Sequence, residues 1–306
     1  MVQAVHFAAS LLACYVTAQV LLRVGWLGRS WTWRSPRVAI VCWQALGLAF
    51  GLSAIGLPMA LGLAPYGTGT GAALWMLATD LVGGRLPAGL TALHLGLVGI
   101  GFGVAATLLG TLARSLLGAL RAQRRHRDLL TLVARDDPAV PGALVLDHPS
   151  AAAYCLPGVR PRVVVSAGTL SLLDRSQLAA VLSHERAHAD ERHDLVLLPF
   201  TALCRALPWV RWVRTAHDEV ALLVEMRADD KARRLHADEP LAAALLRFAT
   251  APSRVTPAGA LGIADSHLDA RVRRLRVTAR PPRLRVASAL GVATLLVSIP
   301  VTLFVS

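Results

Sequence analysis

Four long apolar stretches constrain the fold of this 306-residue chain more than any other feature of its sequence. They cover residues 4–22, 38–63, 86–113 and most of 286–306, and none contains Asp, Glu, Lys or Arg. A helix needs about 20 apolar residues to cross a bilayer. We therefore predict an α-helical membrane protein with four transmembrane helices, three of them in residues 1–113 and the fourth in 286–306. Gly47 with Gly51, and Gly99 with Gly103, are spaced for close helix packing.

The loops predict how the chain crosses the membrane. Arginines cluster after the first and third stretches and before the fourth, whereas the loop between the second and third has Arg85 balanced by Asp80. Because Arg-rich loops stay in the cytoplasm, we expect both termini outside it and residues 114–285 inside. No basic segment precedes the first stretch, which favours a retained helix over a cleaved signal. These flanks at the lipid bilayer of the cell membrane explain the net charge of +13, so we expect no direct nucleic-acid binding.

Residues 114–285 contain a metal-binding pattern. In the run His184-Glu-Arg-Ala-His188, a helix places the two imidazoles one turn apart on one face. Glu225, on a later helical stretch, would complete a two-histidine, one-glutamate site for Zn²⁺ and leave one coordination position open. An ordinary helix surface is the alternative. The β-like stretches 143–147 and 162–166 and a predicted helix under the motif favour the metal site.

The residue types predict distinct roles. Glu185, between the two histidines, would be the catalytic base, taking a proton from the attacking water and returning it to the leaving amine. Asp229 follows Glu225 by one helical turn and would accept the spare N–H of a ligand histidine. The alternative for Asp229 is a solvated helix acid.

Three further residues stay ambiguous. His193 follows His188 by five residues, about 140° further round a straight helix, so it should miss the metal and have a structural or substrate-side role. His267 and Arg271 could contact the oxyanion of the transition state or serve packing and the membrane surface.

The stretch Ala152, Ala153, Tyr154 and Cys155 is predicted to be extended. It is either a core strand or an exposed edge strand that pairs with an extended peptide substrate, and the sequence favours neither.

Residues 195–213 form a fifth apolar stretch, interrupted by two prolines and two arginines. A crossing here would separate Glu225 from His184 and His188 by the bilayer. We therefore expect a helix or helical pair at the membrane surface, with Trp209 and Trp212 near the headgroups.

These residues resemble integral-membrane zinc peptidases of the BlaR/MecR antirepressor type. The resemblance rests on the His184–His188 motif, on Arg192-His193-Asp194, on the run from Glu225 to Asp229, and on residues 151–166 and 270–275. It implies an α+β, zincin-like (gluzincin) cytoplasmic peptidase domain inserted between helices three and four. It also implies signal-dependent cleavage of a cytoplasmic protein, namely a winged-helix transcriptional repressor.

The sequence ends at Ser306, just after the fourth apolar stretch, so we expect no penicillin-sensor domain after it. A signal would then enter through the outer loop 64–85, the membrane helices or a partner. Self-cleavage and a homo-oligomer stay open. Two other functions compete with regulatory cleavage: housekeeping degradation of misfolded membrane proteins, and a non-proteolytic signalling protein in which zinc is only a staple.

Overall fold

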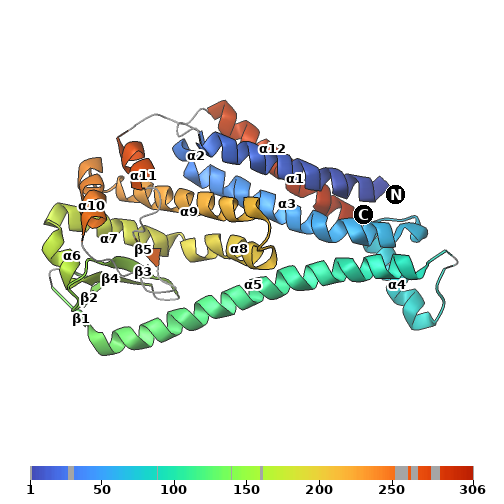
Figure 1. Ribbon diagram of the computed structural model, residues 1–306, viewed down its shortest axis with the longest axis horizontal. Helices are drawn as coiled ribbons and strands as arrows, with labels where there is room; N and C mark the ends of the chain where they lie inside the picture. The colour runs from blue at the N-terminus through green and yellow to red at the C-terminus, as the bar shows by residue number, and fades with distance from the viewer. Residues whose placement is uncertain are drawn as a thin grey trace.

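The computed structural model of the chain describes residues 2–26, 31–87, 89–138, 140–158, 161–251, 261–262, 268–276 and 283–305. These residues form a bundle of long helices with a smaller mixed α/β domain at one end (Figure 1). Both termini of the chain lie at the opposite end of the bundle (Figure 1).

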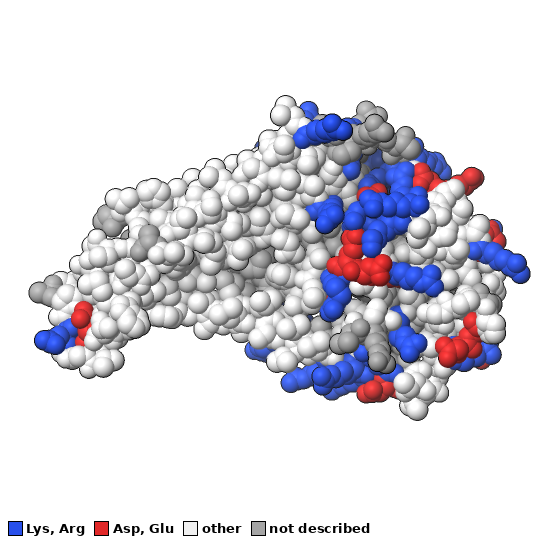
Figure 2. All heavy atoms as spheres, turned by 180° about the vertical axis from the view of Figure 1, so that it is seen from behind, with Lys and Arg blue, Asp and Glu red and all other residues white. Residues whose placement is uncertain are grey.

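Four helices of the bundle are long and apolar enough to cross a membrane, as predicted. They are α1 (Val2–Trp26), α3 (Pro36–Gly62), α5 (Ala92–Val133) and α12 (Arg283–Val305). The face shown in Figure 2 has almost no charged side chains along the bundle, whereas charged side chains gather over the domain. This distribution fits a bundle in contact with lipid and a domain in contact with water.

Helix α3 lies at the centre of the bundle and packs against α1, α5 and α12. Its buried side chains include Trp43, which is 1% exposed. At the end that carries the termini, the ring of Phe7 on α1 lies 5.3 Å from that of Phe304 on α12, measured between centroids. The first and last apolar helices therefore run antiparallel and close the bundle on one side of α3.

Helix α5 is longer than the predicted third span. The sequence predicted a membrane helix over 86–113, whereas the structure has one helix of 42 residues that runs on to Val133. It starts at Ala92 because the side chains of Thr91 and His94 form a capping box at its N-terminus. Its length is about 63 Å at 1.5 Å per residue, roughly twice the thickness of a hydrocarbon core. The second half of α5 therefore reaches the domain.

Three short elements were not predicted. Helix α2 (Trp31–Arg34) joins α1 to α3, and the predicted outer loop 64–85 contains a 3₁₀ turn, η1 (Ala64–Tyr66), and helix α4 (Thr70–Gly83). Helix α4 packs against α12. Its 14 residues are too few to cross a membrane. A search for long apolar stretches therefore assigns this segment to the loop between two spans.

The domain contains a five-stranded mixed sheet in the order β1-β2-β4-β3-β5 among the described residues. The strands are β1 (Ala134–Asp136), β2 (Ala143–Leu146), β3 (Ala153–Leu156), β4 (Arg162–Ser166) and β5 (Leu261–Gly262). Only β2 and β4 pair in parallel; the other neighbours are antiparallel. The predicted β-like stretches correspond to β2 and β4.

The sheet lies between helices on both faces because its apolar side chains alternate between them. Towards α5, one buried cluster contains Leu130, Tyr154, Leu156 and Val164. Towards α7 (Arg175–Asp190) and α10 (Asp238–Thr250), another contains Val145, Val163, Val165, Val181 and Phe248. Helix α6 (Ala167–Leu172) follows β4 directly. The sheet thereby gives α7 a rigid apolar support.

The apolar stretch 195–213 forms a helical pair rather than one helix. Helix α8 (His193–Ala206) and helix α9 (Arg211–Ala232) pack against each other and against α3. The Gln44 amide on α3 donates a 2.7 Å hydrogen bond to the Val196 carbonyl. The Trp212 ring lies edge-on to Phe50 at 5.3 Å, while Trp209 in the turn is 74% exposed. The pair is thus held against the bundle.

The tightest helix contacts occur at glycines outside the predicted pairs. A Cβ atom at Gly47 or Gly51 would make an ordinary contact of 3.8 Å with a leucine of α8 or α5. A Cβ atom at Gly99 or Gly103 would meet no described atom within 4 Å, whereas one at Gly101 would press on Met59. At Gly62, a Cβ atom would meet the backbone of His94 and Val98 on α5. Backbone cannot move aside as a flexible side chain can, so α3 and α5 depend most on Gly62.

We predict that Gly62→Ala destabilises the protein by about 1–3 kcal/mol, the usual cost of overpacking. Thermal unfolding of the purified protein in detergent measures the effect. The matched control is Gly103→Ala on α5, which should leave the melting temperature unchanged or raise it, because Ala is the better helix former. Equal melting temperatures for the two variants would contradict the close approach of α3 and α5 at Gly62.

Candidate metal centre

Helix α7 carries the first part of the site. The side chain of Asp174 caps its N-terminus, accepting hydrogen bonds from the backbone N–H groups of Ser176 and Gln177. The apolar face of the helix packs on the sheet. His184, Glu185 and His188 are all fully buried, each 0% exposed. The cap and the apolar face together fix which residues of α7 point into the domain interior.

Helix α9 packs beside α7 and carries the second part. Glu225 and Asp229 lie one turn apart on it and are 8% and 1% exposed. The structure therefore brings together the four residues expected to bind the metal or to hold its ligands, although the two on α9 follow the two on α7 by 37 or more positions in the chain.

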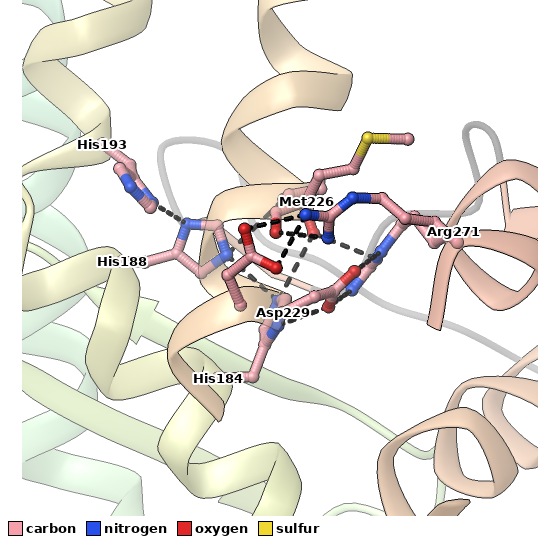
Figure 3. A network of polar contacts seen from close by, with 9 residues as sticks. His184, His188, His193, Met226, Asp229 and Arg271 are labelled. Carbon is pink, nitrogen blue, oxygen red and sulfur yellow. Dashed lines mark hydrogen bonds and ion pairs between the residues drawn. The ribbon is translucent and has the colours of Figure 1, made fainter. Parts of the chain in front are cut away.

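The ligand atoms of the three expected ligands all lie within 4.8 Å of one another, and Figure 3 shows the rings of His184 and His188 side by side. The two Nε2 atoms of His184 and His188 lie 3.2 Å apart. The Glu225 carboxylate lies 3.4 Å from Nε2 of His184 and 3.5 Å from Nε2 of His188. Ligand atoms about 2.0–2.1 Å from a tetrahedral Zn²⁺ are about 3.3 Å from one another. The donor set and its spacing thus fit a tetrahedral ion with one position left for another ligand.

Asp229 contacts His184 on the side of the ring that faces away from the other ligands. Its Oδ1 lies 2.9 Å from Nδ1 of His184, the ring nitrogen that does not face Glu225 and His188. A carboxylate in this place fixes the ring orientation and the tautomer of a metal-binding histidine. The geometry is that of the predicted orienting role.

Arg271 lies on α11 (Leu268–Leu275) and is fully buried. Its guanidinium donates two hydrogen bonds to Asp229, of 2.9 and 2.6 Å, and its third nitrogen lies 3.0 Å from the Glu225 carboxylate (Figure 3). The sequence leaves Arg271 either a contact to the oxyanion or a role in packing. In the structure its nitrogens face two carboxylates of the site and compensate their buried charge.

His193 and His267 were the other two residues expected near the site. His193 is 1% exposed, and its Nδ1 lies 2.9 Å from Nδ1 of His188. It is thus next to the ligand set on the side of His188 that faces away from Glu225. His267 lies outside the described residues.

Glu185 is a buried acid without an ion-pair partner among the described residues. Neither of its carboxylate oxygens has a hydrogen-bond partner in the described part of the chain. Burial, with a smaller contribution from the Glu225 charge, raises the pKa of Glu185 to about 8. A carboxylate that is buried, unpaired and beside a candidate metal site is suited to exchanging a proton near neutral pH.

The predicted extended stretch divides between two environments. Ala152 precedes β3, and its N–H and carbonyl are bonded by Ser166 and Thr169. Ala153, Tyr154 and Cys155 belong to β3, which pairs with β4 on one side. On the other side Tyr154 and Cys155 pair with β5, whose two residues contact α7. At Tyr154 and Cys155 the chain itself therefore occupies the edge that the substrate-binding alternative would need to be free.

The pKa values of the two ligand histidines shift in opposite directions in the metal-free protein. Burial would lower the pKa of His184, but its hydrogen bonds to Asp229 and Glu225 raise it to about 9. Burial lowers the pKa of His188 to about 3. Burial would raise the pKa of Glu225, yet the Arg271 charge lowers it to about 2. The metal-free site thus carries a protonated His184 beside an ionised Glu225.

Glu191 and Arg227 were missed at the level of sequence. The guanidinium of Arg227 donates to both oxygens of Glu191, at 2.8 and 2.7 Å, and Glu191 lies beside His193. Arg227 stands between Glu225 and Asp229 in the sequence, and this position is the one signal that could have indicated it.

Zinc affinity is predicted to depend on pH. A metal ion must displace the His184 proton, so the apparent affinity for Zn²⁺ should rise about tenfold per pH unit up to the His184 pKa of about 9. Competition with a chromogenic chelator between pH 6 and 8 measures this slope. An affinity that does not change with pH would show that His184 is neutral in the metal-free protein.

Comparison with known proteins agrees with the site. Residues 119–255 match the model of Peptidase family M48, whose metallopeptidases typically depend on zinc. The match includes α7 and α9, covers fewer than half of the residues and ends before Arg271. The comparisons with curated proteins and with solved structures give no match. The chain therefore combines a segment similar to this peptidase family with four helices able to span a membrane.

Proposed function

We propose that the protein is a membrane-embedded zinc endopeptidase that hydrolyses peptide bonds of a cytoplasmic protein in signal-dependent regulation. One observation carries the proposal: the ligand atoms of His184, His188 and Glu225 lie at tetrahedral spacing. Glu185 lies between the two histidines on α7, without an ion-pair partner among the described residues. The bundle sits in the cell membrane, with the termini outside the cytoplasm and the domain inside, as the arginine distribution indicates.

In this function His184, His188 and Glu225 would hold the ion, which would supply Lewis-acid chemistry at the scissile carbonyl and the attacking water. Glu185 accepts a proton from the attacking water on a carboxylate oxygen and passes it to the nitrogen of the leaving amine. Asp229 and Arg271 keep His184 and Glu225 in place, and the apolar neighbours of α7 keep bulk water away from the carboxylate.

The state of Glu185 favours an enzyme over a zinc-stapled signalling protein. A structural zinc site needs only its ligands, and an ionisable group without a partner costs stability when it is buried. A buried glutamate without an ion-pair partner destabilises the fold. Catalysis explains why such a residue lies beside the three metal ligands, whereas a structural zinc site does not require it. No described contact specifically favours housekeeping degradation over regulation.

We predict that Glu185→Gln keeps zinc binding and lowers cleavage by about 10²–10⁴-fold, the usual contribution of a general base. Terminal-peptide profiling of cells that carry wild type or the variant identifies the substrate and measures the loss. Glu239→Gln, at an exposed position of α10, is the matched control and should behave as wild type. Identical peptide profiles for wild type and Glu185→Gln would contradict the proposal.

Self-cleavage is the form of regulation that a described contact supports. Leu261 and Gly262 pair antiparallel with β3 beside the catalytic helix, where an extended substrate would add as a strand. The substrate in trans would be a winged-helix repressor, as the family resemblance implies. Displacing β5 would then be a condition for its entry.

We expect the purified full-length protein with zinc to produce a new N-terminus close to Leu261–Gly262. Mass spectrometry of the products locates it, and Glu185→Gln and a chelator should each abolish it. A rate independent of protein concentration would show that cleavage is intramolecular. A wild type that cleaves other substrates while remaining intact would contradict self-cleavage alone.

A further inference from the structure

The chain turns sharply between α7 and α8, and this turn determines where His193 lies. Helix α7 ends at Asp190, and Arg192 has φ 50° and ψ 48°, in the left-handed region. Among the described residues it is the one non-glycine residue with positive φ. Such a conformation costs about 1–3 kcal/mol and persists where surrounding contacts hold it. It ends the straight path of α7 and folds His193 back towards the helix.

The contacts of His193 form one chain of polar groups that starts at a metal ligand. Its Nδ1 lies 2.9 Å from Nδ1 of His188, with the two ring planes 84° apart (Figure 3). Its Nε2 faces the Glu191 carboxylate at 3.4 Å. Arg227 holds Glu191 through two hydrogen bonds of 2.8 and 2.7 Å. Each group in the chain therefore has a defined neighbour on either side.

The direction of the hydrogen bonds follows from the metal geometry. Nε2 of His188 faces His184 and Glu225, so it must offer its lone pair to the ion. The proton of this neutral ring is then on Nδ1, which donates to Nδ1 of His193. His193 in turn carries its own proton on Nε2, which points at Glu191. A single tautomer of each ring satisfies every contact.

We propose that His193 is the positioning residue of His188, with Glu191 and Arg227 fixing the ring of His193. His193 would fix the ring orientation and tautomer of His188. Asp229 has the same role for His184, whose Nδ1 lies 2.9 Å from the Asp229 carboxylate. The inference rests on the metal site of the proposed function and adds the orienting partner of its second histidine.

Two other roles for His193 do not fit its surroundings. As a fourth metal ligand it would have to reach the Nε2 side of His188, but its Nδ1 contacts the opposite side of that ring. As a substrate contact it would need an open face, and it is 1% exposed.

The test compares two substitutions in the full-length protein in detergent. His193→Phe fills the space but removes the acceptor, and should weaken zinc binding by about 10–100-fold, the usual effect of losing such a partner. His193→Asn places an amide oxygen near the position of Nδ1 and should restore most of the affinity. Competition with a chromogenic chelator measures the affinities. The Co²⁺ absorption spectrum reports the ligand geometry and should change in His193→Phe but not in His193→Asn.

Glu191 supplies a second measurement, a double-mutant cycle. Glu191→Ala should weaken zinc binding in the wild-type background and have little further effect in His193→Phe. The control is Glu239→Ala, at an exposed position of α10. Equal effects of Glu191→Ala in the two backgrounds would contradict the proposal that Glu191 acts on zinc binding through His193.

The outcomes separate the role of His193 from the existence of the site. Equal zinc affinities of wild type and His193→Phe would overturn the positioning role. Equally weak binding by the Phe and Asn variants, with lower melting temperatures for both metal-free proteins, would also overturn it by showing a purely structural role. A wild type that binds no zinc would instead contradict the proposed function.

Discussion

The ion pair between Arg271 and the carboxylates of Asp229 and Glu225 is the interaction on which the metal centre depends. Three acids, including Glu185, lie buried in one small volume, and like charges in such a place repel and lose hydration. Arg271 brings a fully buried cation to two of them. Because α11 delivers it just before α12, the site is complete only when the last part of the chain has docked.

Much of the site followed from local sequence rules. Helical periodicity placed His184 and His188 on one face, and the same periodicity placed Asp229 beside Glu225. The structure has both arrangements, because each needs only a regular helix. His193 was different: the straight-helix rule gave it no neighbour in the site, and one residue in the left-handed region, Arg192, folds it back against the far side of His188. A single backbone angle of this kind leaves no pattern in composition or spacing.

Long-range contacts account for most of the rest. The pairing of Leu261 with Cys155 joins residues more than 100 positions apart, and the bond between Arg271 and Asp229 spans 42. Periodicity and hydropathy describe neighbours along the chain, so neither could indicate these partners. The four apolar helices were predictable because the bilayer imposes their length. The close contact at Gly62 was not, because it depends on which face of α3 meets α5.

Helix α5 runs without a break from the end of the bundle near α4 to the sheet, and β1 starts at the very next residue, Ala134. There is no loop at this junction to absorb movement. For a rod of about 63 Å, a lean of 5° about the end near α4 sweeps the other end through about 5 Å, more than the spacing of two neighbouring strands. A small tilt of α5 within the bundle would therefore be passed directly to the sheet that supports α7.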